Sequence, residues 1–160
     1  ELGWNLDYCR LRVWLSEKYG VGKAYIFIGN IPRNGGLYTY LQECGFTLVF
    51  KEVIYGDGGK PKGNCDADLV LRATIDAFEK NFDKAVVVAS DGDYASLVKF
   101  LGEKLEVILS PAIEEKCSIL LKRTGAPISY INDQKSILEV RDEDKNEAKN
   151  EKAPDEDETS

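Results

Sequence analysis

Short apolar runs alternate along this chain with longer segments of helical periodicity, and this alternation restricts the fold more than any other feature. The clearest run, AVVVA at residues 85–89, is typical of a strand that is covered on both faces. Strands that alternate with helices form βαβ units with right-handed crossovers. The sequence therefore predicts an α/β protein with three layers, α/β/α, around a mostly parallel sheet.

The apolar periodicity, with glycines and capping residues at its breaks, gives the boundaries of these elements. Helices are predicted over residues 8–19, with Asp7 as the cap, and over 34–44, 66–82, 94–101 and 113–122. Strands are predicted over residues 23–28, 46–53, 85–89, 105–109 and 128–131. The Gly-rich segment 55–64 has no apolar core of its own and is predicted to be a loop.

The charge of the chain is concentrated at its end. The whole sequence carries a net charge of −7, and residues 141–160, with nine acidic and four basic residues, account for −5 of it. A segment with so few apolar residues cannot offset the entropy lost on ordering, so we predict a disordered acidic tail at 141–160 after a domain over 1–134. The folded part lacks the broadly basic surface that is typical of proteins that bind nucleic acid, so any contact with nucleic acid would need local basic patches.

Several kinds of chemistry are excluded by composition. The sequence has no histidine, which removes Ser-His, Cys-His and His-metal sites. Its four cysteines are widely spaced without a CxxC pair, which favours reduced thiols in a cytoplasmic protein. No run approaches the roughly 20 apolar residues of a membrane helix. Carboxylates, lysines, hydroxyls and thiols remain as reactive groups.

The tetrapeptide Ser90-Asp91-Gly92-Asp93 directly follows the AVVVA run. In parallel α/β sheets the ligand site lies at the carboxyl ends of the strands. Two carboxylates this close repel each other unless a cation offsets the charge, and Mg²⁺ or Mn²⁺ takes such oxygens. The alternative is that Asp93 caps the following helix while Asp91 makes a turn.

Asp66 favours the metal site over the capping alternative. At about 100° per residue, it lies above the stripe of Val70, Ala73 and Ala77 that packs on the sheet. A carboxylate on a buried stripe is costly unless it is used. Asp68, on the other side of the helix, is expected to face solvent. Asp66, Asp91 and Asp93 are therefore the candidate catalytic residues and metal ligands.

Polar groups that follow other strands would share this edge and could contact phosphates. These candidates are Lys60, Lys62, Arg33 and Asn30. Ser90, which directly follows the AVVVA run, is a further substrate-site candidate that could orient a carboxylate or a water.

Two motifs at this separation resemble a known family. Residues 62–66 (KGNCD), followed by a long helix and then by VVVASDGDY at residues 86–94, are similar to the NYN domain, a branch of the PIN-like nucleases. The resemblance covers roughly residues 5–132. It implies a PIN-like, Rossmann-like fold and a Mg²⁺- or Mn²⁺-dependent ribonuclease that hydrolyses RNA phosphodiester bonds. Its acidic residues correspond to Asp66, Asp91 and Asp93.

One part of the family pattern is missing. Family members begin with a central strand that carries a metal-binding Asp, just upstream of the segment that resembles residues 1–15, and this sequence has no such strand. Asp7 begins a helix and cannot replace it. We therefore expect an N-terminally truncated copy of the domain.

Two other functions stay open. The first is a non-catalytic RNA- or protein-binding module that keeps the fold. The second is a Toprim-like nuclease, which also ends a strand with Asp-x-Asp and for which Glu52 is a weak candidate as the additional acid. The sequence leaves a homo-oligomer open and gives no membrane partner.

Overall fold

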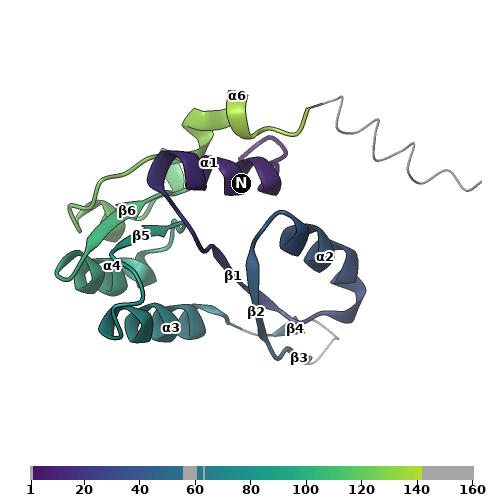
Figure 1. The fold of residues 1–160 in the computed structure, drawn as a ribbon, viewed down its shortest axis with the longest axis horizontal. Coiled ribbons are helices and arrows are strands. Elements are labelled where there is room, and N and C mark those ends of the chain that lie inside the picture. Colours follow the sequence, from purple (N-terminus) through teal and green to yellow (C-terminus); the bar gives the residue numbers. More distant parts are fainter. Residues whose placement is uncertain (1, 56–60, 63, 142–160) are drawn as a thin grey trace, which may run out of the picture.

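The computed structural model describes residues 2–55, 61–62 and 64–141, and it confirms an α/β fold with parallel strands. The helices are α1 (Tyr8–Tyr19), α2 (Gly35–Glu43), α3 (Asp66–Phe78), α4 (Ala95–Gly102), α5 (Ile119–Lys122) and α6 (Lys135–Leu138). The strands are β1 (Tyr25–Gly29), β2 (Thr47–Lys51), β3 (Ile54–Tyr55), β4 (Pro61–Lys62), β5 (Lys84–Val87) and β6 (Glu106–Leu109). Figure 1 shows their arrangement.

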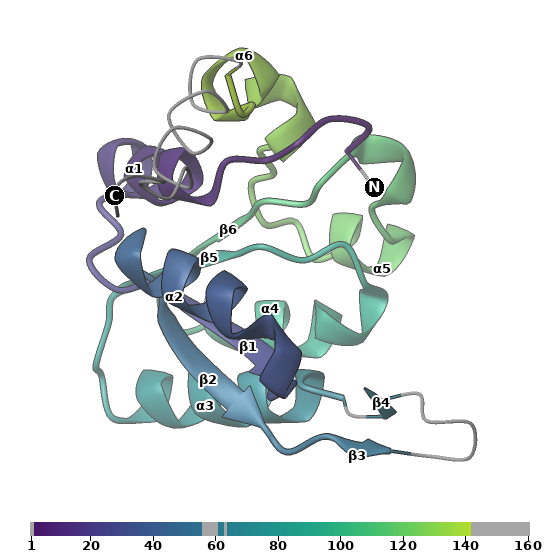
Figure 2. The same cartoon turned by 90° about the vertical axis from the view of Figure 1, so that its right-hand side faces the viewer.

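The parallel strands form two separate pairs. β1 pairs with β2, with Phe27 opposite Val49, and β5 pairs with β6, with Val86 opposite Ile108. β3 and β4 form a short antiparallel pair beyond the carboxyl end of β2 (Figure 2). Within the described residues, no pairing joins β1 to β5.

Helices cover both faces of these strands, so the three predicted layers are present. One core, built on Leu101, Leu109 and Leu121, joins α3, α4 and α5 to β5 and β6. The other joins α1, α2 and α6 to the opposite face through Leu11 and Leu138.

Local chemistry explains where α1 begins and ends. The side chain of Asp7 accepts a hydrogen bond from the backbone N–H of Arg10 at 3.0 Å, as predicted for a helix cap. Gly20 ends the helix at φ 70°, in the left-handed region that favours glycine.

Two of the predicted helices have the wrong bounds. The helix predicted over 66–82 ends at Phe78, because Lys80 turns the chain at φ 57° and Asn81 N–H bonds back to Asp76. The helix predicted over 113–122 is a 3₁₀ turn followed by α5, because Ser118 is extended at ψ 138° and caps a new helix.

The strand predicted over 128–131 is reduced to one bridge between Leu109 and Ile128. The chain then turns into a 3₁₀ segment and α6, which the sequence patterns did not indicate. β3 and β4 lie within or beside the segment predicted as a loop.

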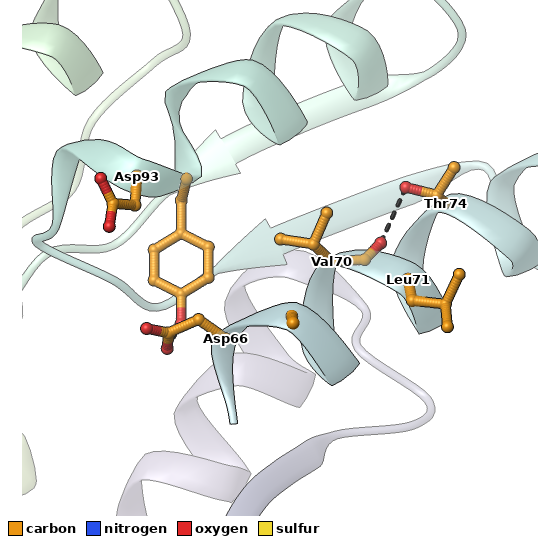
Figure 3. Close-up of a pocket in the computed structure, with 7 residues that line it drawn as sticks. Asp66, Val70, Leu71, Thr74 and Asp93 are labelled. Carbon is orange, nitrogen blue, oxygen red and sulfur yellow. Dashed lines mark hydrogen bonds between the residues drawn. The ribbon is translucent and has the colours of Figure 1, made fainter. Parts of the chain in front are cut away.

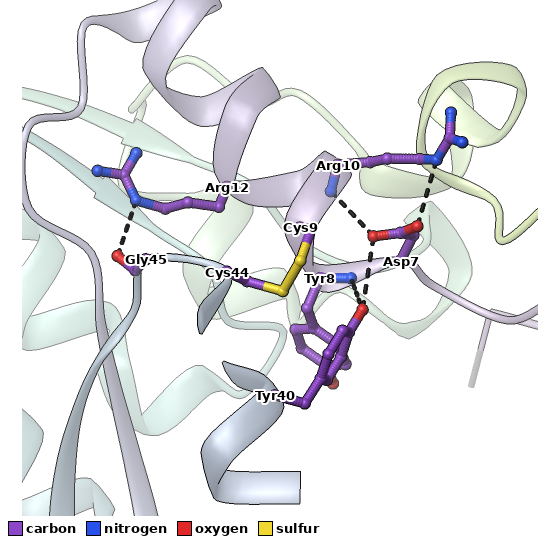
Figure 4. Close-up of a disulfide and its surroundings, with 8 residues drawn as sticks. All are labelled: Asp7, Tyr8, Cys9, Arg10, Arg12, Tyr40, Cys44 and Gly45. Atoms are coloured by element: carbon purple, nitrogen blue, oxygen red, sulfur yellow. Dashed lines mark hydrogen bonds and ion pairs between the residues drawn. A yellow bond between two sulfur atoms is a disulfide. The ribbon is translucent and has the colours of Figure 1, made fainter. Parts of the chain in front are cut away.

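The expectation of reduced thiols is wrong for two of the four cysteines. Cys9 in α1 and Cys44 after α2 form a disulfide with their Cα atoms 4.4 Å apart (Figure 4). Their separation of 35 residues hid this pairing from sequence reasoning. Cys65 and Cys117 are free thiols.

Candidate functional site

The turn after β5 carries two of the predicted ligands. Asp91 is the N-cap of a 3₁₀ turn at Gly92–Tyr94, and its Oδ1 accepts a hydrogen bond from Asp93 N–H at 3.0 Å. The turn that the capping alternative assigned to Asp91 is therefore present, but Asp93 does not cap the following helix, because α4 begins at Ala95 with Tyr94 at its N-cap position and without a side-chain cap. Both carboxylates remain exposed, so capping and cation binding are compatible.

Gly92 lets this turn lie against α5. A Cβ atom at position 92 would lie 2.5 Å from the Ser118 Oγ and 3.1 Å from Leu120 Cδ1. Ser118 N–H also donates to the Ser90 carbonyl at 2.9 Å. The turn that presents Asp91 and Asp93 is thus held against a neighbouring helix through a contact that only glycine permits.

Asp66 enters the site from the first turn of α3 and is half-buried. Its backbone N–H donates to the Asn64 Oδ1 at 2.7 Å, which fixes the start of the helix. The Tyr94 hydroxyl donates a hydrogen bond to the Asp66 Oδ1. Burial, and then this bond to Asp66, raise the pKa of Tyr94 well above its usual range, so the hydroxyl stays protonated and keeps donating.

A cleft of about 400 Å³ lies beside these groups. Asp66 and Asp93 lie at one end of it, and Val70, Leu71 and Thr74 line the rest (Figure 3). The structure therefore brings two of the three predicted carboxylates, from different elements, to one cleft.

The donor chemistry of Asp66, Asp91 and Asp93 suits a hard divalent cation, because carboxylate oxygens are the ligands that Mg²⁺ and Mn²⁺ prefer. Among the residues that the structure describes, no three His, Cys, Asp or Glu side chains are grouped closely enough to hold an ion. The three aspartates as a set of metal ligands stay a prediction.

The predicted phosphate-contacting residues differ in their surroundings. Asn30 and Arg33 are exposed after β1, where the Tyr38 hydroxyl donates to the Gly29 carbonyl at 2.8 Å and accepts from Ile31 N–H at 2.9 Å. That tyrosine holds the loop that presents them.

The remaining three candidates are Ser90, Lys62 and Lys60. Ser90 Oγ accepts from Ala112 N–H at 3.3 Å, so it fixes the loop after β6. Lys62 belongs to β4 and its backbone pairs with Ile54. Lys60 lies outside the described residues, as do residues 142–160 of the tail predicted over 141–160.

Sequence reasoning missed two groups near the site. Tyr94 ends the second sequence motif, but only the fold reveals its bond to Asp66. Lys51, at the end of β2, forms an ion pair at 2.8 Å with Asp68, whose side chain keeps 36% exposure on the side of α3 that was expected to face solvent. The signal for Lys51 was its position at a strand end, on the same edge as the other polar groups.

Comparisons with known proteins agree with this architecture. The model of the NYN domain family matches residues 2–131, and the chain belongs to this family. The crystal structure of a protein of unknown function from Vibrio parahaemolyticus superposes with a TM-score of 0.69 at 22% identity, and the match covers 86% of this chain and 84% of that one. None of the curated proteins matches. None of the helices in the described part of the chain is long and apolar enough to span a membrane.

Proposed function

We propose that the protein is a metal-dependent ribonuclease that hydrolyses RNA phosphodiester bonds at the edge formed by Asp66, Asp91 and Asp93. The observation that carries the proposal is that Asp66 from α3 and Asp93 from the turn after β5 line one cleft. Membership of the NYN domain family, whose members are generally ribonucleases, supports the same assignment.

Asp66, Asp91 and Asp93 would hold Mg²⁺ or Mn²⁺, and a bound ion of this kind supplies a water activated for attack on phosphorus. Asp91 also keeps the turn in shape through its bond to Asp93 N–H. The Tyr94 hydroxyl donates to the Asp66 carboxylate and would compete with a bound ion for it. The predicted contacts to phosphate are Arg33, Asn30, Lys60 and Lys62, with Ser90 fixing the neighbouring loop.

The test is cleavage of a labelled single-stranded RNA by the full chain in Mn²⁺, compared with Asp66→Asn, Asp91→Asn and Asp93→Asn. The matched control is Asp68→Asn, because Asp68 lies in the same first turn of α3 as Asp66 and is paired with Lys51. We expect cleavage by the wild type and the control and a loss of at least about 100-fold in the three site variants. Equal cleavage by wild type and Asp91→Asn contradicts the proposal.

Metal binding gives a second readout that does not require turnover. Mn²⁺ broadens NMR signals of nearby amides, so we expect titrated Mn²⁺ to broaden residues 64–68 and 90–94 first. Asp91→Asn should weaken this effect, whereas Asp68→Asn should not.

A non-catalytic RNA-binding module is the second candidate, and two observations favour it. The Asp66 carboxylate is already engaged by Tyr94, and the described residues contain no group of three metal-binding side chains. This candidate predicts RNA binding without cleavage, with an affinity that rises in Asp91→Asn as repulsion of phosphate falls.

A further inference from the structure

The helix α3 carries more apolar surface than the core of the domain uses. Val70, Ala73 and Ala77 form the stripe that packs against the core with β5 and β6. A second row lies about 100° round the helix from this stripe and consists of Ala67, Leu71, Thr74 and Phe78. A surface helix needs only one apolar stripe to pack on its own domain. This second row, called the outer row below, therefore has no role in the core.

The outer row is exposed to solvent. Leu71 is 59% exposed and Phe78 is 65% exposed, and Ile75 beside them is 42% exposed. Figures 1 and 2 both place α3 at the outside of the molecule. Single exposed apolar residues are ordinary, but large ones in a continuous row along one helix indicate an interaction surface.

The amino-terminal half of the outer row contains a hole. This hole is the cleft of about 400 Å³ described above, which is lined by Val70, Leu71 and Thr74 (Figure 3). The carboxylates of Asp66 and Asp93 lie at its end. The hole is thus apolar along its length and negatively charged at one end.

The carboxyl-terminal end of the row carries an aromatic knob. The ring of Phe78 lies against that of Phe100 in α4, with 5.5 Å between their centroids. The Nζ atom of Lys104 lies 4.9 Å from the Phe78 centroid and 5.1 Å from that of Phe100. An exposed ring and a positive charge therefore form one unit, which complements an apolar hole that ends in two carboxylates.

The knob cannot enter the hole of its own chain. Phe78 follows Val70 by eight residues, which is about 12 Å along the helix axis. Thr74 lies halfway between them. If a second copy packs with its α3 antiparallel and the twofold axis passes at Thr74, each Phe78 lies opposite Val70 of the partner subunit. One surface then supplies both sides of the contact, as a twofold interface requires.

Thr74 suits the position on the axis. Its side chain is short, which allows two helices to approach closely. Its Oγ1 already donates a hydrogen bond to the Val70 carbonyl at 2.7 Å. Burial between two helices would therefore not leave this hydroxyl without a partner.

We propose that two copies of this chain associate through their outer rows, with antiparallel α3 helices. Each Phe78 fills the cleft of the other copy. Each Lys104 lies beside Asp66 and Asp93 of the partner subunit.

Other occupants fit the surface less well. RNA would need cations along the row, but Leu71 and Ile75 are apolar, and Asp66 and Asp93 repel phosphate. A different protein would have to supply a knob, a hole and a cation at the same spacing. A second copy supplies all three by symmetry.

The association has a consequence for the candidate site. It would close the end of the cleft at which Asp66 and Asp93 lie, so the monomer would be the form open to metal and RNA. This consequence rests on the proposed function. The association itself rests only on the outer row and the charges at its two ends.

The first test is sedimentation of the full chain between about 1 µM and 1 mM, without RNA or metal. We expect the mass to rise from one chain toward two as concentration increases. Thr74→Lys puts two like charges at the axis and should raise the dissociation constant by at least about tenfold. The matched control is Val13→Lys, because Val13 is 54% exposed on α1, outside the outer row. It should dissociate as the wild type does.

A charge exchange tests the ends of the row. Lys104→Glu should weaken association by at least about tenfold, because it sets three carboxylates together. Adding Asp93→Lys in the same chain should restore most of the loss. Lys116→Glu makes the same change of net charge at an exposed residue outside α3 and α4, and it should have no effect.

Disulfide cross-linking tests the direction of the helices. In a Cys65→Ser background, which leaves the buried Cys117 in place, Thr74→Cys should link two chains under mild oxidation. Ala67→Cys lies in the same row but about 21 Å from its copy in the antiparallel arrangement, so it should not link.

Four outcomes overturn the proposal. They are a chain that stays monomeric over this range, a dimer that Thr74→Lys and Lys104→Glu leave unchanged, equal cross-linking at positions 67 and 74, and RNA that shifts the NMR signals of residues 71, 75 and 78 in a monomer. Because sedimentation uses neither RNA nor metal, the association can fail while the ribonuclease proposal stands, and the reverse.

Discussion

The hydroxyl of Tyr94 donates a hydrogen bond to the carboxylate of Asp66. Tyr94 ends the turn after β5 and Asp66 begins α3, so this bond joins the two elements that carry the candidate ligands. Tyr94 is only 9% exposed, and its ring packs in the core with Leu97 and Leu101. The bond therefore connects the site to the rigid interior of the domain.

Replacing Tyr94 with Phe keeps the ring and removes the donor. We expect the free energy of unfolding to fall by about 1 kcal/mol, because the half-buried Asp66 carboxylate loses a hydrogen bond. Mn²⁺ should bind more tightly, because Asp66 no longer has a competing donor. Urea unfolding and a Mn²⁺ titration measure the two effects.

Tyr19→Phe is the matched control for this change. The Tyr19 hydroxyl is buried without a hydrogen-bond partner in the described structure, so its removal should leave stability unchanged or raise it. Equal losses in both variants would mean that the bond to Asp66 contributes nothing.

Gly92→Ala should destabilise the turn between Asp91 and Asp93. The new Cβ would lie 2.5 Å from Ser118 Oγ, which caps α5 by accepting from Leu120 N–H at 3.2 Å, so it cannot move away freely. We expect a loss of about 1–3 kcal/mol in thermal or urea unfolding. Adding Ser118→Gly should restore part of it, because glycine is a tolerated N-cap and removes the clashing atoms. A double variant no more stable than Gly92→Ala would contradict this reason.

The candidate site was predictable where one residue's position depends on local periodicity. Asp66 follows from the apolar stripe of α3, and Asp91 and Asp93 follow from the end of an apolar strand. The bond from Tyr94 was not predictable, because it depends on how two elements 28 residues apart pack together. The same applies to the ion pair between Lys51 and Asp68.

The fold was predictable to a similar degree. The layers could be predicted from the alternating helix and strand patterns, because each pattern depends on residues that are close together in the sequence. The carboxyl-terminal end of α3 and the division at Ser118 were missed, because a single backbone turn at Lys80 or Ser118 interrupts an apolar pattern that continues past it. The disulfide was missed because Cys9 and Cys44 meet only after α1 and α2 pack.

The protein should lose stability in acid because of Asp76. This residue is buried near the carboxyl-terminal end of α3, whereas Asp66 begins the helix. Burial opposes its charged form, but the hydrogen bonds from Arg72 and Asn81 outweigh this and lower the pKa of Asp76. A carboxyl whose folded pKa is depressed stabilises the protein above its unfolded pKa, near 4, and loses this contribution as pH falls through the lower folded value. In Asp76→Asn the loss of stability between about pH 5 and pH 3 should be smaller than in the wild type, as measured by urea unfolding at each pH. An unchanged pH profile would mean that these bonds do not favour the charged form.

The disulfide between Cys9 and Cys44 should contribute more to stability than any single hydrogen bond of the site. It closes a loop with a sequence separation of 35, and it joins the start of α1 to the end of α2. Reduction increases the freedom of the unfolded chain, so we expect the free energy of unfolding to fall by about 3 kcal/mol. The paired variant Cys9→Ser with Cys44→Ser should show the same loss in urea unfolding without reductant, and reductant should then have no further effect. Cys65→Ser, which removes a free thiol, is the control and should respond to reductant as the wild type does. If reductant leaves the wild-type midpoint unchanged while the thiols are titrated as free, the disulfide does not stabilise the domain.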